Sequence, residues 1–201
     1  MPLHLPHIFQ LSFQRYQNLI DKYVDSVRGQ FYGHDHEDYV KILRTCDDQG
    51  KCEGDPSSAL YAGPSLTEGW PSENPAIRYY DYDRETGEII DSHTYSMNIT
   101  EANVKGLDEV EWYLEYSALK SYGMTDVSAS SWSDALERMK SDPDLWWLHH
   151  QHRSREYDGV ISSSSGAKQC SDKNNATCAL NFLCFELWVS EEGAASCVEG
   201  A

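Results

Sequence analysis

The first part of the chain alternates between amphipathic and short extended patterns. Over residues 11–27, apolar side chains recur every three or four positions, which predicts an amphipathic helix that ends at Gly29. Residues 30–32 and 39–43 are aromatic or apolar runs typical of strands, and a polar loop separates them. The expected order is therefore helix, strand, polar loop, strand.

The middle of the chain carries the pattern of a β-hairpin. Residues 77–82 and 89–97 flank a polar connection that has Gly87 near its end. Before this hairpin, residues 46–54 are expected to form a surface loop. Residues 59–63 are only a short apolar stretch ahead of an irregular, proline-containing segment.

The remainder of the chain is predicted to be helical. Helices are expected at residues 110–122, where Gly123 ends the pattern, and at 131–139, with Ser131 as the cap. Two further apolar segments, at 144–151 and 179–189, are also expected to be helices. The four serines at residues 162–165 are expected to form a flexible linker.

Composition limits the possible partners. With 40% hydrophobic residues among 201, the chain is globular and long enough for one sizeable core. Its 33 acidic and 16 basic residues give a formal charge of -17, which repels phosphate backbones, so no nucleic-acid partner is expected. It has no apolar run of about 18 residues. Residues 1–10 lack the features of a signal peptide, so any export signal is expected upstream or absent.

The six cysteines point to disulfides. Cys46 and Cys52 form one close pair, and a bridge between them would pin the 46–54 loop. The other four gather late in the chain: Cys170, Cys178, Cys184 and Cys197. Their spacing differs from the C-x2-4-C pattern of structural zinc sites, so zinc is the less favoured alternative.

Two N-glycosylation sequons support the same compartment. They begin at Asn98 and Asn175, although such tripeptides also occur by chance. Together with paired cysteines they predict an oxidising, secretory location, extracellular or lysosomal.

The sharpest chemical feature is the run Gly33-His34-Asp35-His36 after a predicted strand. On a tight loop that glycine permits, both imidazoles can converge on neighbouring metal ions, as a two-metal phosphoryl-transfer site requires. The alternative is two exposed loop histidines. Asp35 and Glu37 could orient the imidazoles, or simply be solvated.

Residues 16–38 resemble the helix, strand and final metal-binding loop of acid sphingomyelinases, a family of calcineurin-like metallophosphoesterases. Further segments resemble the family in the same order: residues 62–67, 74–80 and 95–100, Trp112 with Tyr113, Tyr122 with Gly123, Trp132, residues 145–147 and the four late cysteines. The similarity covers nearly the whole chain from residue 16 onward.

This resemblance implies an α+β fold. Residues 1–100 would be the C-terminal portion of a metallophosphoesterase β-sandwich, with a helix, edge strands and a β-hairpin. Residues 101–201 would form a disulfide-pinned helical subdomain. It also implies bridges that join Cys170 to Cys178 and Cys184 to Cys197, and a glycan at Asn98.

The resemblance further implies a two-zinc phosphodiesterase that hydrolyses sphingomyelin to ceramide and phosphocholine. His34 would bind the second zinc and His36 the first. Most of the family's other ligands have no recognisable counterpart. His4 is a candidate and His7 a weaker one, while Asp91-Ser92-His93 is in the wrong order and is expected to be surface. Two imidazoles cannot hold a dinuclear centre, so the chain is expected to be an inactive fragment.

Two other functions remain open. One is a metallophosphodiesterase acting on nucleotide or other phosphodiesters, and the other is a non-catalytic secreted binding domain. The expected partners are a sphingolipid or other phosphodiester substrate and a membrane lipid surface, with no protein partner. Trp146, Trp147, His149 and His150 could face lipid or choline, but core packing is favoured for this helix.

Overall fold

The computed structural model describes residues 5–67, 74–106, 110–155, 170 and 172–200, and side chains from residue 13 onward apart from residue 191. The predicted linker at 162–165 and the candidate ligand His4 lie outside the described residues. The elements in chain order are α1 (Leu5–Lys22), β1 (Gln30–Tyr32), β2 (Tyr39–Arg44), β3 (Pro56–Ala62), β4 (Ala76–Tyr82), β5 (Ile89–Ser96), α2 (Ile99–Lys105), β6 (Tyr113–Ser117), α3 (Ala118–Tyr122), α4 (Ala129–Met139), α5 (Pro143–Arg153), α6 (Ala176–Leu187) and α7 (Glu191–Glu199). The expected α+β class is confirmed.

The first sheet has the strand order β1-β3-β2. The predicted strands β1 and β2 are present and form its edges, parallel and antiparallel to β3 respectively. The central strand β3 was missed because its apolar stretch is short and rich in small residues. Tyr61 and Ala62 are buried, and Pro56 stands at the first position of the strand, where a missing N–H is tolerated.

The second sheet has the order β4-β5-β6, and its β4–β5 hairpin is confirmed. The helix predicted over 110–122 is wrong in its first half. Residues Tyr113–Ser117 form β6, which pairs with β5, and only Ala118–Tyr122 is helical, ending at Gly123 with φ 59°. Tyr113 and Tyr116 are good strand formers, and the open edge of β5 supplies backbone partners that a helix would not use.

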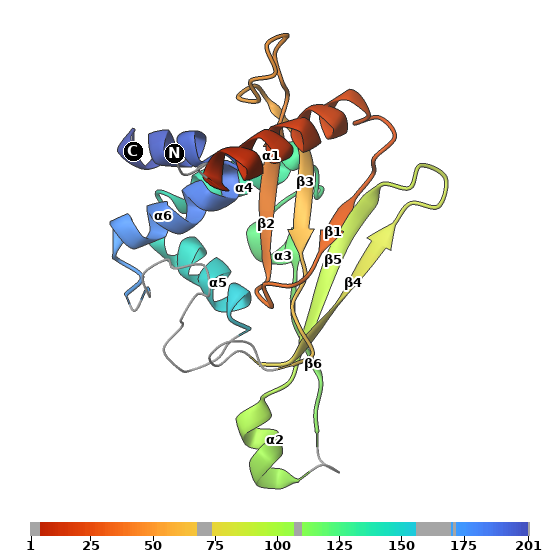
Figure 1. Ribbon diagram of the computed structural model, residues 1–201. Coiled ribbons are helices and arrows are strands. Elements are labelled where there is room, and N and C mark those ends of the chain that lie inside the picture. The colour runs from red at the N-terminus through yellow and green to blue at the C-terminus, as the bar shows by residue number, and fades with distance from the viewer. Residues whose placement is uncertain (1–4, 68–73, 107–109, 156–169, 171, 201) are drawn as a thin grey trace.

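The helices cover the first sheet. Helices α4 and α6 contact β2, α4 also contacts β3, and α1 touches both strands (Figure 1). The core between them includes the fully buried Ile42, Leu136 and Leu183. None of the described helices is long and apolar enough to cross a membrane.

Three helix predictions need adjustment. Helix α1 ends at Lys22, several residues before Gly29. Helix α4 begins earlier than expected, because Ser128 rather than Ser131 is its N-cap and accepts a hydrogen bond from the Ser131 amide. On α5, Trp146 is 1% exposed, so core packing is confirmed and the lipid-facing alternative is wrong for this side chain.

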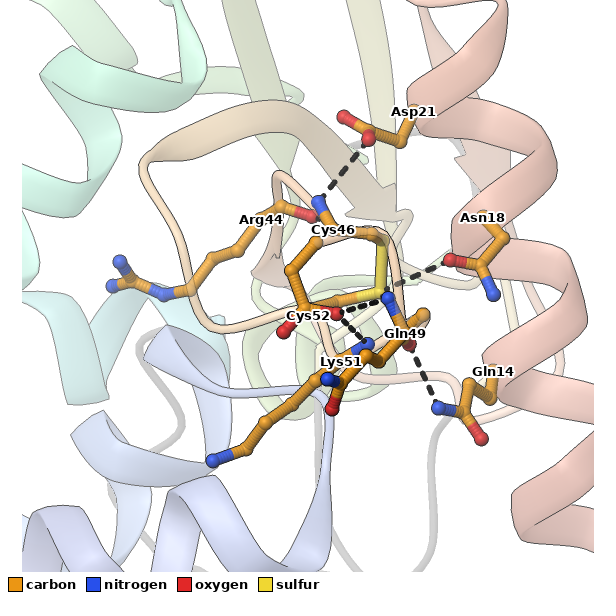
Figure 2. The surroundings of a disulfide bond; sticks show 10 residues. Gln14, Asn18, Asp21, Arg44, Cys46, Gln49, Lys51 and Cys52 are labelled. Carbon is orange, nitrogen blue, oxygen red and sulfur yellow. Dashed lines mark hydrogen bonds between the residues drawn. A yellow bond between two sulfur atoms is a disulfide. The ribbon is translucent and has the colours of Figure 1, made fainter.

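All six cysteines form disulfides: Cys46–Cys52, Cys170–Cys178 and Cys184–Cys197. The prediction of disulfides is therefore confirmed, and the zinc alternative for these cysteines is wrong. Figure 2 shows the 46–52 loop docked on α1. There Gln14 Nε2 donates to the Gly50 carbonyl over 2.7 Å, and the Cys46 amide donates to Asp21 Oδ2 over 3.1 Å. The bridge therefore fixes a loop that in turn holds the first helix.

Candidate functional site

The segment between β1 and β2, residues 33–38, is the histidine loop. Its positive backbone angles fall on the histidines themselves, with φ 88° at His34 and 64° at His36, whereas Gly33 is not left-handed. The expectation that the glycine permits the tight turn of this loop is therefore wrong. Each left-handed non-glycine residue costs roughly 1 to 2 kcal/mol, so the loop keeps this shape only where its surroundings hold it.

The two imidazoles lie at the surface of the loop. His34 is exposed and His36 is partly buried. The Nδ1 atom of His36 is 3.5 Å from Thr67 Oγ1, which itself lies 2.8 Å from Ser65 Oγ. Asp35 is exposed and accepts a hydrogen bond from the Tyr39 hydroxyl. The loop thus presents its imidazoles outward while its far end turns into the protein.

The last residue of the loop, Asp38, is 3% exposed and is held by the second sheet. Its carboxylate pairs with Arg78 of β4 and accepts hydrogen bonds from Thr94 over 3.2 Å and Tyr116 over 2.9 Å. Desolvation, the largest single effect, would lower the pKa of Arg78, but Asp38 together with Tyr116 and Tyr80 outweighs it and raises that pKa well above its usual value. The pair therefore stays charged and fixes the loop to β4, β5 and β6.

Glu37, 4% exposed, is held from the helical side. Its Oε2 accepts from Nε of Arg153 over 2.9 Å, and the other end of the same guanidinium donates to Glu186 Oε1 over 2.7 Å. Glu186 Oε2 also lies 2.8 Å from His149 Nε2. Burial would raise the pKa of Glu186, but His149 and Arg153 outweigh it and lower that pKa. Glu37 is therefore not solvated, which corrects that reading of the sequence.

A chain of polar contacts continues behind this pair. The Tyr122 hydroxyl lies 3.1 Å from His149 Nδ1 and 2.9 Å from His152 Nδ1. Because a phenol carries one proton, one imidazole nitrogen accepts that proton and the other donates to the oxygen. Burial, followed by His149 and Arg78, lowers the pKa of His152 to about 3. His152 is therefore held neutral.

A second arginine reaches the loop from the end of α5. Arg155 is completely buried and has a left-handed φ of 57°. Its guanidinium donates to the carbonyl oxygens of His36 and Asn74. Asn74 returns a bond from Nδ2 to the Arg155 carbonyl over 3.0 Å, and its Oδ1 accepts from the Ile99 amide over 3.1 Å. The backbone of His36 is therefore tied to the α5 terminus.

The histidine loop alone would supply only part of a metal centre. Across the residues that the structure describes, no group of three or more His, Cys, Asp and Glu side chains could hold a metal ion. A catalytic zinc needs at least three protein ligands and an open position. His34 and His36 suit two such ligands, but the described residues do not fit a complete two-zinc centre, and no reaction step is assigned to one.

The other predicted site residues lie elsewhere. His93 is on β5, with Nε2 2.9 Å from Asp81 Oδ2 and 3.7 Å from Asp91 Oδ2, as part of the hairpin. Asn98 and Asn175 are exposed N-caps, whose side chains accept from the amides of Glu101 and Cys178. Their side chains are accessible, as a glycan would require.

The buried residues that anchor the histidine loop could hardly be predicted from the sequence. Glu37 and Asp38 look like solvated loop residues, and Arg153 sits near a helix end, where a cation is ordinary. Glu186 was the one available signal, because it interrupts an apolar run on α6 and a charge there needs a partner. That partner, Arg153, lies 33 residues earlier in the chain.

Comparison with known proteins gives a consistent result. The family model of the acid sphingomyelin phosphodiesterase C-terminal region matches residues 65–198. An acid sphingomyelinase-like phosphodiesterase 3b of Homo sapiens is 32% identical over 165 residues, which are 78% of this chain and 34% of the relative. A cyclic GMP-AMP phosphodiesterase of Bos taurus is 35% identical over 139 residues, 64% of this chain and 29% of the relative.

The histidine loop lies before the family-model match but within a longer alignment. Sphingomyelin phosphodiesterase B of Dictyostelium discoideum is 25% identical over 190 residues, 92% of this chain and 28% of the relative. An alignment of that extent includes His34 and His36. The chain spans 28 to 34% of the length of these three relatives.

Proposed function

Because the chain belongs to the acid sphingomyelin phosphodiesterase family, we propose that it supplies two metal ligands, His34 and His36, to a zinc-dependent phosphodiesterase. The observation that carries this proposal is the build of the histidine loop. His34 is exposed and His36 is partly exposed, while Glu37 and Asp38 beside them are almost fully buried and charge-paired. A loop of solvated histidines needs no such anchoring.

Two zinc ions in such enzymes polarise a phosphoryl group and supply hydroxide. The 201 residues provide two imidazoles toward that centre and are proposed to be inactive alone. The proposed inactivity is supported because, in the described part of the chain, no group of three or more His, Cys, Asp and Glu side chains could hold a metal ion. The remaining ligands would come from protein beyond this sequence, as the short span against the relatives suggests.

The proposed substrate class is a sphingolipid phosphodiester. A relative that aligns with 92% of the chain is named a sphingomyelin phosphodiesterase. A second candidate is a nucleotide phosphodiester, favoured by a 35% identical relative named a cyclic GMP-AMP phosphodiesterase. The three disulfides favour an oxidising location, extracellular or lysosomal, with glycans at the exposed Asn98 and Asn175.

The ligand assignment is tested by titrating the purified chain with Zn²⁺ while recording imidazole ¹H–¹⁵N spectra. We expect zinc to shift the signals of His34 and His36 first. A His34→Ala, His36→Ala variant should lose this response, whereas His93→Ala, at a histidine on the hairpin, should keep it. Zinc responses confined to other histidines would contradict the assignment.

The expected inactivity is tested by zinc content and hydrolysis of sphingomyelin and cyclic GMP-AMP at acidic pH. Turnover with two bound zincs, lost in the double histidine variant, would show a complete enzyme and contradict the inactive reading. Turnover of one substrate would also choose between the two candidate classes. No turnover, together with zinc shifts at His34 and His36, is the expected result.

A further inference from the structure

The histidine loop and the end of α5 are far apart in sequence but joined by three links. Arg153 pairs with Glu37, and its own carbonyl accepts a hydrogen bond from the Asp38 amide over 3.4 Å. The Arg155 guanidinium donates to the carbonyl of His36. The links therefore fall on three consecutive residues, beginning at one of the candidate metal ligands.

The α5 side of this junction is rigid. Arg153 is 3% exposed, and Glu186 of α6 holds the end of its guanidinium that Glu37 does not use. The guanidinium carbon lies 4.7 Å from the Tyr39 ring centroid and 4.8 Å from that of Phe182, so ring faces confine it on both sides. Because its planar fork has fixed directions, Arg153 sets where the Glu37 carboxylate lies.

These links hold the part of the histidine loop whose backbone conformation is strained, at His36. His36 has a left-handed backbone, and its carbonyl is the acceptor for Arg155. The separate Asp38–Arg78 pair fixes the loop to the second sheet but does not touch His36. Loss of the α5 links would leave the β2 end of the loop attached and free the turn at His36 to relax.

We propose that Arg153 and Arg155 are positioning residues, which fix the backbone of His36 and thereby the direction of its imidazole for metal binding. This rests on the proposed metal role of His36. The helical region, through α5 and α6, then sets the geometry of a ligand carried by the first sheet. Neither arginine touches the metal; both act through the histidine loop.

The test uses Arg155→Lys, Arg153→Lys and Glu37→Gln in the full 201-residue chain. Glu37→Gln breaks the pair at the loop while it leaves Arg153 bonded to Glu186. The matched control is Arg44→Met. Arg44 is half-buried, lies 4.0 Å from the Trp188 ring and, like Arg155, donates to backbone carbonyls, but these carbonyls lie outside the histidine loop.

Amide hydrogen exchange in the histidine loop, read at Asp38, whose amide donates to the Arg153 carbonyl, is compared with that of α4, which reports the stability of the core. We expect loop exchange to accelerate about 10-fold or more, since bonds to charged groups are the strong ones, with α4 changing no more than in Arg44→Met. The zinc affinity read from the His36 signal should fall about 10-fold. Arg153→Lys should retain part of the loop protection because it keeps the charge.

Equal acceleration in the loop and in α4, or a loop response no larger than that of Arg44→Met, overturns the positioning role. Selective loop acceleration supports it. If that acceleration occurs while zinc shifts neither His34 nor His36 in the unmodified chain, the proposed function fails, and the arginines still position the loop. The exchange and zinc measurements therefore separate the two ideas.

Discussion

Replacing His150 by leucine should remove a large part of the acid sensitivity of this protein. His150 is completely buried on α5, with its ring centroid 4.9 Å from that of Trp146 and 5.3 Å from that of Phe182. Burial, reinforced by the positive charge of Arg153, lowers its pKa from 6.5 to about 4. The folded chain therefore resists a proton that the unfolded chain accepts readily.

The sign and size follow from these two pKa values. Between pH 6.5 and 4 the unfolded state binds more protons at this position, so the free energy of unfolding falls as the pH falls. The loss from His150 is about 2 kcal/mol at pH 5 and about 3 kcal/mol at pH 4. Well above pH 6.5 the histidine is neutral in both states and contributes no pH dependence.

Guanidinium unfolding at pH 7, 5 and 4, followed by tryptophan fluorescence, measures the effect. Carboxylates contribute equally to both proteins, so the quantity of interest is the difference between them. We expect the stability of the unmodified chain to fall toward that of His150→Leu, or below it, as the pH drops. Val127→Ala, a buried apolar truncation, should give a constant difference at every pH. A constant difference for His150→Leu as well would refute the reasoning.

Two further predictions concern the scaffold. Loss of the Cys184–Cys197 bridge in Cys184→Ala, Cys197→Ala should lower the free energy of unfolding by about 3 kcal/mol, because its 13-residue separation closes a moderate loop; an unchanged denaturation midpoint would contradict this. Arg78→Met should cost about 3 to 5 kcal/mol by leaving Asp38 buried and unpaired. The double variant with Asp38→Leu should recover much of that loss in the same unfolding assay, and a loss equal to the sum of both single changes would argue against the pair.

The parts of the fold that could be predicted have a clear local period. The β4–β5 hairpin alternates around a polar turn, α4 repeats apolar residues at helical spacing, and α5 and α6 contain dense apolar runs. Tyr113–Ser117 lacks such a signal, because its aromatic and apolar residues suit either a strand or a helix. Pairing with β5 decides, and this contact comes from tertiary structure that the local sequence does not contain.

The candidate site also has a part that could be predicted from the sequence and a part that could not. The Gly-His-Asp-His run marked the histidine loop directly, since the two candidate ligands are close neighbours in sequence. The anchors of the loop were not predictable, because Glu37 meets Arg153 across 116 residues and Asp38 meets Tyr116 across 78. Charge pairs between residues so far apart produce no periodic pattern in the sequence. Only Glu186, which is buried, indicated that a cationic partner was required.

Because Glu37 and Glu186 share one guanidinium, these positions cannot be substituted in any order during evolution. Loss of Arg153 removes a cationic partner from two buried carboxylates at once and leaves Glu186 with His149, whereas loss of either carboxylate leaves the arginine one partner. During evolution, the residue at position 37 or 186 should therefore be replaced first and the residue at position 153 last. Homologues that lack the arginine should have a neutral residue at position 37, and should keep a carboxylate at position 186 only together with the histidine at position 149.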